Sequence, residues 1–268
     1  MGFVKGLLIV LGILLLLYLF LAAPRLDRRS LGALAGVDYA HRGLWSESVP
    51  ENSLPAFRLA VENGYGIELD VHLTQDDALV VFHDDNVKRM CGVDRPISGM
   101  TLAQVRALRL KDTDCLIPTL DEVLEAVDGK APLIVEIKPD ARLSELCAAA
   151  CARLRAYAGP YCVESFHPMA VRWFRINAPE VIRGQLAYGC SEMRHGLTDI
   201  AVSSLIGNVL GRPDFIAYEA ATDHNLPMAY MRLCRPYLVA WTVRSQETME
   251  QLRSRYDLQI FEGILPNR

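Results

Sequence analysis

The hydrophobic positions of this chain follow two patterns, one long uninterrupted run near the start and many short runs after it. The long run, Gly6–Ala23, contains eighteen residues without a charged side chain and is rich in leucine. A helix of that length can cross the hydrocarbon layer of a bilayer, so the run predicts one transmembrane anchor within residues 1–23. A cleaved signal peptide is the rival interpretation, although its apolar region is normally only ~7–15 residues long.

The remainder alternates short apolar stretches with amphipathic segments, a pattern typical of an α/β fold with a parallel sheet. Helix starts are indicated at Asn52-Ser53 and at the capping-box patterns that begin at Thr101 and Thr119, and helical periodicity runs through Leu143–Tyr157. One TIM barrel uses about 250 residues, so the part of the chain after the anchor predicts a single (β/α)8 barrel. Nine candidate strands end at Ala40, Asp70, His83, Ile137, Phe166, Leu186, Tyr218, Val243 and Phe261.

One of these nine strands must lie outside an eight-stranded barrel. Only eight residues separate Asp70 from Leu79, whereas a parallel crossover needs a dozen or more. The strand that ends at Asp70 and the strand that ends at His83 are therefore expected to pair antiparallel, with the turn at residues 74–77. The next segment, residues 84–118, lacks a strong strand pattern and predicts a small insertion over the barrel mouth.

Composition narrows the functional classes. The chain has 28 basic and 32 acidic residues and a formal net charge of −4, so no basic surface indicates nucleic acid as a partner. No pattern indicates an obligate protein partner. The seven cysteines are odd in number and unevenly spaced, unlike a disulfide framework, which favours a reducing compartment.

Charges beside the apolar run predict the topology. Lys5 precedes the run, and Arg25, Arg28 and Arg29 follow it. Basic residues next to a span tend to stay on the cytoplasmic side, so we expect a single-pass protein of the cell membrane with a cytoplasmic barrel. The chain then divides into the anchor at residues 1–23, a polar tether at residues 24–36 and the barrel domain at residues 37–268.

Polar residues at the ends of apolar strands carry the candidate chemistry, because a barrel active site lies at the carboxyl ends of its strands. Glu68 and Asp70 stand two residues apart on one strand, so their carboxylates share a face. A paired Glu and Asp is more often a solvated or salt-bridged surface feature. The apolar residues 133–135 before Glu136 favour the functional interpretation, because an unpaired buried carboxylate is energetically costly.

Three kinds of side chain make up the candidate site. Glu68, Asp70 and Glu136 can bind a hard divalent cation. The cationic side chains of Arg42 and Lys138 can bind a phosphate, and the histidines His41 and His83 can exchange protons near neutral pH. Together these groups predict cleavage of a phosphodiester. His72 should share a strand face with Asp70, whereas His167, His195 and His224 are expected to be loop or surface residues.

The order of these motifs resembles the glycerophosphodiester phosphodiesterase family over residues 38–266. The matching segments are His41-Arg42-Gly43, Pro50-Glu51-Asn52-Ser53, Glu68-x-Asp70, His83-Asp84, Ile117-Pro118-Thr119-Leu120, Glu136-x-Lys138, Ser165-Phe166 and Trp241-Thr242-Val243. The resemblance implies a TIM barrel that hydrolyses a phosphodiester to glycerol 3-phosphate and an alcohol with a divalent cation, often Ca²⁺ or Mg²⁺.

The resemblance also implies roles for individual residues. It assigns Glu68, Asp70 and Glu136 to the metal, His41 and His83 to acid/base catalysis, and Arg42 and Lys138 to the phosphate. Glu51 matches an acidic position near the catalytic centre. Trp241 either forms an apolar wall for the substrate or fills the barrel.

One segment departs from the family pattern, which commonly has Thr-Asp-x-Pro after the last strand. Here the chain has Phe261-Glu262-Gly263-Ile264-Leu265-Pro266. Two alternatives to the implied activity remain open. One is a lysophospholipase D-like activity on membrane lysolipids, which the anchor suggests. The other is an inactive barrel that binds a phosphorylated head group. The sequence also leaves open which histidine is the acid.

Overall fold

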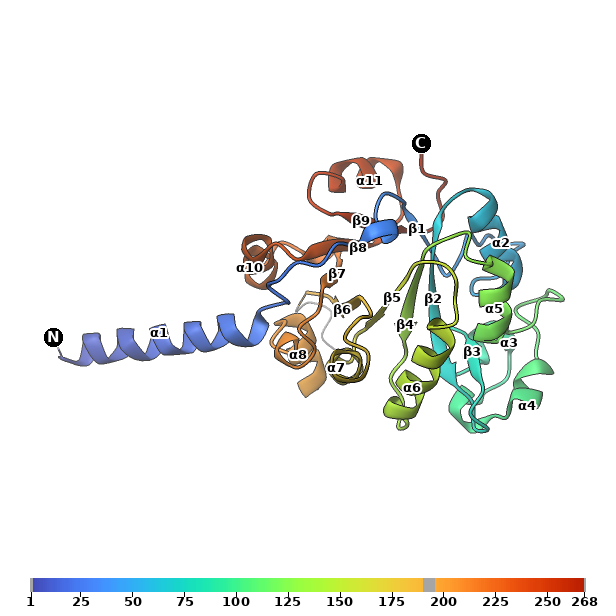
Figure 1. Ribbon diagram of the computed structural model, residues 1–268, viewed down its shortest axis with the longest axis horizontal. Coiled ribbons are helices and arrows are strands. Elements are labelled where there is room, and N and C mark those ends of the chain that lie inside the picture. The colour runs from blue at the N-terminus through green and yellow to red at the C-terminus, as the bar shows by residue number, and fades with distance from the viewer. Residues whose placement is uncertain (1, 190–195, 268) are drawn as a thin grey trace.

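A closed barrel of parallel strands forms the centre of the computed structural model, which describes residues 2–189 and 196–267 (Figure 1). Its strands are β1 (Tyr39–His41), β2 (Gly66–Leu73), β4 (Leu133–Ile137), β5 (Tyr161–Ser165), β6 (Arg183–Ala187), β7 (Phe215–Glu219), β8 (Tyr237–Val243) and β9 (Leu258–Phe261). Neighbouring strands pair in this order, and β1 pairs with both β9 and β2, which closes the barrel. The predicted TIM barrel is confirmed.

The extra strand is β3 (Leu79–Val81), which pairs antiparallel with β2 outside the barrel. Val71 pairs with Val81 and Leu73 with Leu79, so the hairpin predicted from the short connection is confirmed. The pairing also extends β2 to Leu73, three residues beyond the predicted strand end at Asp70, because β3 supplies backbone partners there.

The insertion after β3 contains only short helical elements among its described residues. These are α3 (Lys88–Cys91), the 3₁₀ turn η2 (Ile97–Gly99) and α4 (Leu102–Arg106). They enclose a small hydrophobic core of their own that includes Phe82, Met90 and Val105. Its first residues, Asp84 and Asp85, line the cavity at the barrel mouth.

Helices surround the barrel and pack on its outer face (Figure 1). Two of them begin at predicted signals: the Ser53 side chain accepts a hydrogen bond from the backbone N–H of Ala56 at the start of α2, and Thr119 forms a complete capping box with Glu122 at the start of α5. The helices are α2 (Leu54–Glu62), α5 (Leu120–Val127), α6 (Leu143–Leu154), α7 (Pro168–Asn177), α8 (Leu197–Ser203), α9 (Asn208–Gly211), α10 (Leu226–Cys234) and α11 (Gln246–Leu252), with 3₁₀ turns η1 (Gly32–Leu34) and η4 (Ala220–Thr222).

The segment expected to be a polar tether, residues 24–36, packs against the barrel. Leu31 and Leu34 are buried in the cluster that fills the barrel interior. The Arg29 guanidinium donates a 2.8 Å hydrogen bond from Nε to Asp214, just before β7. This segment therefore fixes the chain at the end of the barrel where the strands begin.

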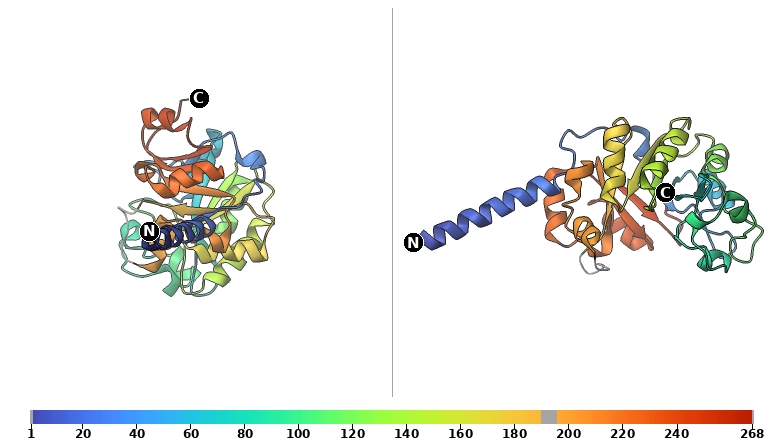
Figure 2. Two further views of the ribbon diagram at one scale, coloured as in Figure 1. Left: turned by 90° about the vertical axis from the view of Figure 1, so that its left-hand side faces the viewer. Right: turned by 90° about the horizontal axis from the view of Figure 1, so that it is seen from below.

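The first helix, α1 (Gly2–Ala22), projects away from the barrel in Figure 1 and in the right-hand view of Figure 2. It is long and apolar enough to cross a membrane, with a mean hydropathy of 2.7 and none of that window buried. Its last turns contact the barrel. Tyr230 of α10 donates from its hydroxyl to the Leu19 carbonyl at 2.9 Å, and Asn208 of α9 donates to the Ala22 carbonyl at 2.8 Å.

Candidate active site

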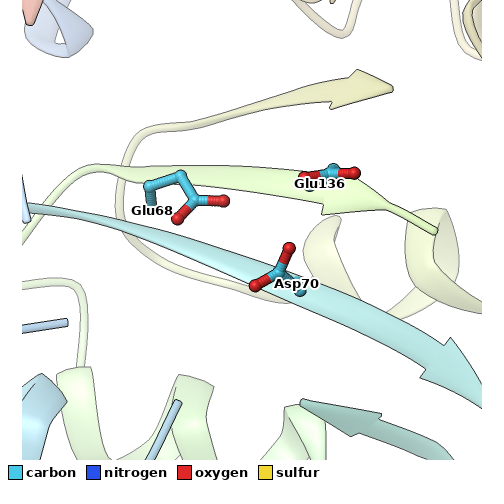
Figure 3. A group of neighbouring side chains, drawn as sticks. All are labelled: Glu68, Asp70 and Glu136. Atoms are coloured by element: carbon cyan, nitrogen blue, oxygen red, sulfur yellow. The ribbon is translucent and has the colours of Figure 1, made fainter. Parts of the chain in front are cut away.

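Three buried carboxylates lie together on the neighbouring strands β2 and β4 (Figure 3). Glu68 and Asp70 come from one face of β2, and Asp70 pairs in register with Glu136 of β4. Their ligand atoms all lie within 4.8 Å of one another. Oxygen-only ligands suit a hard divalent cation, and all three carboxylates are buried. The group is therefore able to hold a metal ion.

Lys138 bridges two members of this acidic group. Its Nζ lies 2.9 Å from Glu136 Oε1 and 3.1 Å from Asp70 Oδ1. Burial alone would lower the pKa of Lys138, but the two carboxylates outweigh it and raise the pKa above its usual value. The same charge holds the pKa of Asp70 low against the effect of burial. Lys138 therefore stays charged and partly neutralises the cluster.

Glu68 and Glu136 behave differently from Asp70. Burial, followed by the charge of Asp70 and the other carboxylates, raises the pKa of Glu68 well above its usual value. Burial also raises the pKa of Glu136 to about 7, although Lys138 opposes the shift. The raised pKa values favour the protonated form of both carboxyl groups, and a bound cation would displace those protons because a metal ligand must be deprotonated.

Arg42 is held from two sides. Its backbone N–H donates a 3.0 Å hydrogen bond to Glu68 Oε2, and its Nη1 donates a 2.9 Å bond to Glu51 Oε1. Glu51 also accepts from Arg89 of α3, which in turn binds Asp84. Glu51 thus lies near the carboxylate group, as expected, and links Arg42 to the insertion.

Both candidate histidines are oriented by a carboxylate at Nδ1. His41 Nδ1 lies 2.6 Å from Glu262 Oε2, and His83 Nδ1 lies 2.6 Å from Asp84 Oδ1. A carboxylate only accepts, so Nδ1 carries the proton in each ring and Nε2 is left to face the site. Burial lowers the pKa of both histidines, which favours the neutral ring.

The candidate residues converge on one mouth. A small cavity of about 140 Å³ is lined by His41, Arg42, Glu68 and His83, among others. A larger cavity of about 660 Å³ includes Lys138, and both cavities share the lining residues His83, Glu136, Phe166 and Trp241.

Two aromatic rings form part of the cavity wall. Trp241 packs edge-on against Phe166, with ring centroids 5.6 Å apart at 83°. Trp241 is only partly buried. Its ring therefore lines the cavity as well as packing against the barrel interior.

Comparison with known proteins agrees with this geometry. The model of the glycerophosphoryl diester phosphodiesterase family matches residues 41–256, most of the chain. The chain belongs to this family.

Individual relatives match over shorter segments. A glycerophosphodiester phosphodiesterase of Caldanaerobacter subterraneus subsp. tengcongensis is 43% identical over 107 residues, which are 37% of this chain and 44% of that protein. A human lysophospholipase D is 35% identical over 141 residues, 47% of this chain and 44% of that protein. The matched part of the chain thus spans less than half the length of these curated relatives.

Solved structures match over nearly the whole barrel. An Oleispira antarctica phosphodiesterase in complex with the product sn-glycerol-3-phosphate gives a TM-score of 0.73 at 22% identity, covering 87% of this chain and 95% of that one. A glycerophosphodiester phosphodiesterase of Thermotoga maritima gives 0.67 at 26% identity, covering 84% and 94%.

Two acidic residues at the site were missed by sequence reasoning. Glu262, which binds His41, lies in the segment where the chain departs from the family pattern. Glu164 of β5 pairs in register with Glu136 and is buried, and burial followed by the charges of Glu136 and Asp70 raises its pKa well above the usual range. Each directly follows apolar residues near the end of a barrel strand, and that position was the available signal.

Two further polar residues support the site. Asn52 donates from Nδ2 to Asp70 Oδ2 at 2.8 Å, so it holds a metal-binding candidate, whereas Ser53 alone caps α2. His72 is buried with Nε2 3.3 Å from the His83 carbonyl oxygen. Of the other histidines, His167 caps α7, His224 is exposed, and His195 lies outside the described residues.

Proposed function

We propose that this chain hydrolyses glycerophosphodiesters to glycerol 3-phosphate and an alcohol in a metal-dependent reaction. The proposal rests on one observation. The acidic group, the basic side chains of Arg42 and Lys138 and the two oriented histidines lie together at one barrel mouth. Family membership over residues 41–256 supports the reaction class.

Glu68, Asp70 and Glu136 would hold the divalent cation, Ca²⁺ or Mg²⁺. Both ions prefer oxygen ligands, and the three carboxylates supply only oxygen. When bound, the cation supplies Lewis-acid stabilisation of charge on the phosphate. Asn52 and Lys138 orient the carboxylates through their contacts with Asp70 and Glu136.

Arg42 and Lys138 would bind the phosphate. Arg42 is fixed at its backbone by Glu68 and at its guanidinium by Glu51, so little side-chain freedom is lost when an anion binds. Trp241 and Phe166 provide an apolar wall beside this position for the glycerol or alcohol part.

His41 and His83 would divide the proton transfers. One ring, in its neutral form, removes a proton from the attacking nucleophile through Nε2, and the other, in its imidazolium form, gives its Nε2 proton to the leaving alkoxide. Glu262 and Asp84 keep the proton on Nδ1 of each ring, so both rings present Nε2 to the reacting groups.

A second candidate substrate class is membrane lysolipids, cleaved by a lysophospholipase D-like reaction at the same site. The apolar helix α1 and the similarity to a human lysophospholipase D favour it. Turnover of glycerophosphocholine and of lysophosphatidylcholine by the full chain distinguishes the two classes.

The decisive experiment measures alcohol release from a panel of glycerophosphodiesters with and without chelator. We expect release only with the divalent cation, and restoration when Ca²⁺ or Mg²⁺ is returned. Undiminished release in excess chelator would contradict the metal assignment. If the wild type and a His41→Ala/His83→Ala control both bind a head group and neither releases alcohol, the chain is an inactive binding barrel.

We also propose that α1 is retained as a single-pass anchor of the cell membrane, with the barrel on the cytoplasmic side and domain limits at residues 1–23, 24–36 and 37–268. Side chains of the barrel bind carbonyls of Leu19 and Ala22, which supports retention over cleavage. The basic residues after the helix support the cytoplasmic side. An alkaline phosphatase fusion after Arg268 should be inactive, and a fluorescent reporter there should be active; the reverse pair would place the barrel outside.

A further inference from the structure

Two helices of the barrel carry apolar stripes beside the point where α1 leaves it. On α10, Leu226, Tyr230 and Leu233 are spaced four and three residues apart, so they lie on one helix face. The middle residue, Tyr230, packs against α1, with the centroids of its ring and the Tyr18 ring 6.3 Å apart. Leu226 and Leu233 on either side are 83% and 80% exposed.

The same arrangement occurs on α8. Leu197 and Ile200 are three residues apart on α8, and the backbone carbonyl of Ser204, just after the helix, accepts a 3.2 Å hydrogen bond from the Tyr18 hydroxyl. Leu197 is 87% exposed and Ile200 is 46% exposed. Exposed leucine and isoleucine side chains thus lie on α8 and α10, the two helices next to the last turns of α1.

The end of α1 and the residues just after it are joined to the barrel by several hydrogen bonds. Besides the bonds from Tyr230 and Asn208, Arg212 donates to the carbonyls of Phe20 at 2.9 Å and Ala23 at 2.6 Å. The backbone N–H of Arg25 donates to the Pro213 carbonyl at 2.9 Å. A bilayer that α1 crosses is therefore held at a defined position against this side of the barrel, where α8 and α10 flank the helix (Figure 1).

We propose that the α8–α10 face is a membrane seat, formed by Leu197, Ile200, Leu226 and Leu233, which rests in the lipid surface around α1. This inference rests on the proposed retention of α1 as a span. This surface would contact the lipid bilayer, because it adjoins α1, the helix that enters the bilayer. Exposed leucines that contact lipid lose their unfavourable contact with water, which would stabilise this position of the barrel at the bilayer.

The seat also lies next to the barrel mouth. Helices of a (β/α)8 barrel begin at the carboxyl ends of the strands, where the mouth is. Asp199 of α8, between Leu197 and Ile200 in sequence, lines the larger mouth cavity. One edge of the mouth is thus placed at the lipid surface.

Tryptophan reporters in the full chain test this seat. Leu226→Trp and Leu233→Trp would be reconstituted separately in phosphatidylcholine vesicles with or without lipid brominated near the headgroup end of the acyl chain. We expect the added emission, after subtraction of the unsubstituted protein, to shift to the blue and to be quenched by the brominated lipid. Leu265→Trp is the matched control, because Leu265 is also an exposed leucine, at 67%, close to the C-terminus and away from α1.

Leu11→Trp within α1 tests membrane insertion of α1 independently of the membrane seat. Quenching at Leu11→Trp with Leu226→Trp and Leu233→Trp behaving like the control would overturn the seat and leave the span intact. No quenching at Leu11→Trp would overturn both. These readouts do not depend on hydrolysis, so failure of the proposed enzymatic activity would leave them unchanged. The replaced side chains are exposed, so the substitutions leave the core unaltered.

Discussion

Replacement of Glu262 tests how the site orients His41. The 2.6 Å contact between Glu262 Oε2 and His41 Nδ1 is a hydrogen bond to a charged acceptor. Burial alone would raise the pKa of Glu262, but the bond from His41 and the charges of His41 and Arg244 outweigh it and lower the pKa to about 2. The carboxylate is therefore ionised at neutral pH, and the contact is lost only as the pH falls towards about 2.

The expected magnitude follows from the kind of bond. Hydrogen bonds to charged groups contribute about 1.5–3 kcal/mol and neutral ones about 0.5–1.5 kcal/mol. Glu262→Gln keeps an acceptor but loses the charge, a difference of about 1–2 kcal/mol, so kcat should fall about 5- to 30-fold if the bond orients the ring during reaction. Glu262→Ala loses the whole bond, and kcat should fall about 10- to 150-fold.

The assay is steady-state release of alcohol from glycerophosphocholine by wild type, Glu262→Gln and Glu262→Ala. KM should change little, because Glu262 is assigned to His41 and not to the phosphate. Arg244→Gln is the control: it removes the 2.6 Å bond from Arg244 Nε to Glu262 but leaves the bond to His41. A partly exposed ion pair contributes about 0–1 kcal/mol, so kcat in this control should fall at most about fivefold.

A double-mutant cycle separates orientation from general structural damage. In a His41→Ala background, Glu262→Ala should cause no further loss of kcat, because the ring that it orients is absent. An additive loss, or a kcat for Glu262→Ala within about twofold of wild type, would refute the reasoning.

Three further predictions concern the other site residues. His41→Ala and His83→Ala should each lower kcat by about 10² to 10⁴ with unchanged thermal unfolding, and a near-normal rate in either variant removes that residue from the mechanism. Lys138→Met should lower the free energy of unfolding by about 3–5 kcal/mol in chelator, because it leaves buried carboxylates unpaired. Denaturant titration should show a smaller loss with saturating Ca²⁺, and equal losses under both conditions would count against a shared cation site. Because Glu68 and Glu136 have raised pKa values and must deprotonate to bind metal, Ca²⁺ affinity measured by calorimetry should increase from pH 6 to pH 8, and a pH-independent affinity contradicts this assignment.

Local sequence patterns were sufficient for the elements and for the core of the candidate site. Period-two spacing placed Glu68 and Asp70 on one face of β2, and the short connection to Leu79 required the hairpin with β3. Capping boxes at Thr101 and Thr119 marked two helix starts correctly. These features depend on residues close in sequence, so the chain itself carries the information.

The tertiary structure alone decided which distant residues meet. His41 and Glu262 are 221 positions apart and touch because β1 and β9 close the barrel. Glu164 reaches the acidic group only through the register between β4 and β5. Strand closure and register depend on packing of the whole core, which no local pattern encodes.

The same distinction applies to the N-terminal segment. The sequence by itself determined that α1 is long and apolar enough to cross a membrane, because length and hydropathy are properties of consecutive residues. The contacts of Tyr18 with Tyr230 and Ser204, and the burial of Leu31 and Leu34, join segments almost at opposite ends of the chain. Only the folded barrel brings those surfaces together, and it therefore decided on which side of the barrel the helix leaves.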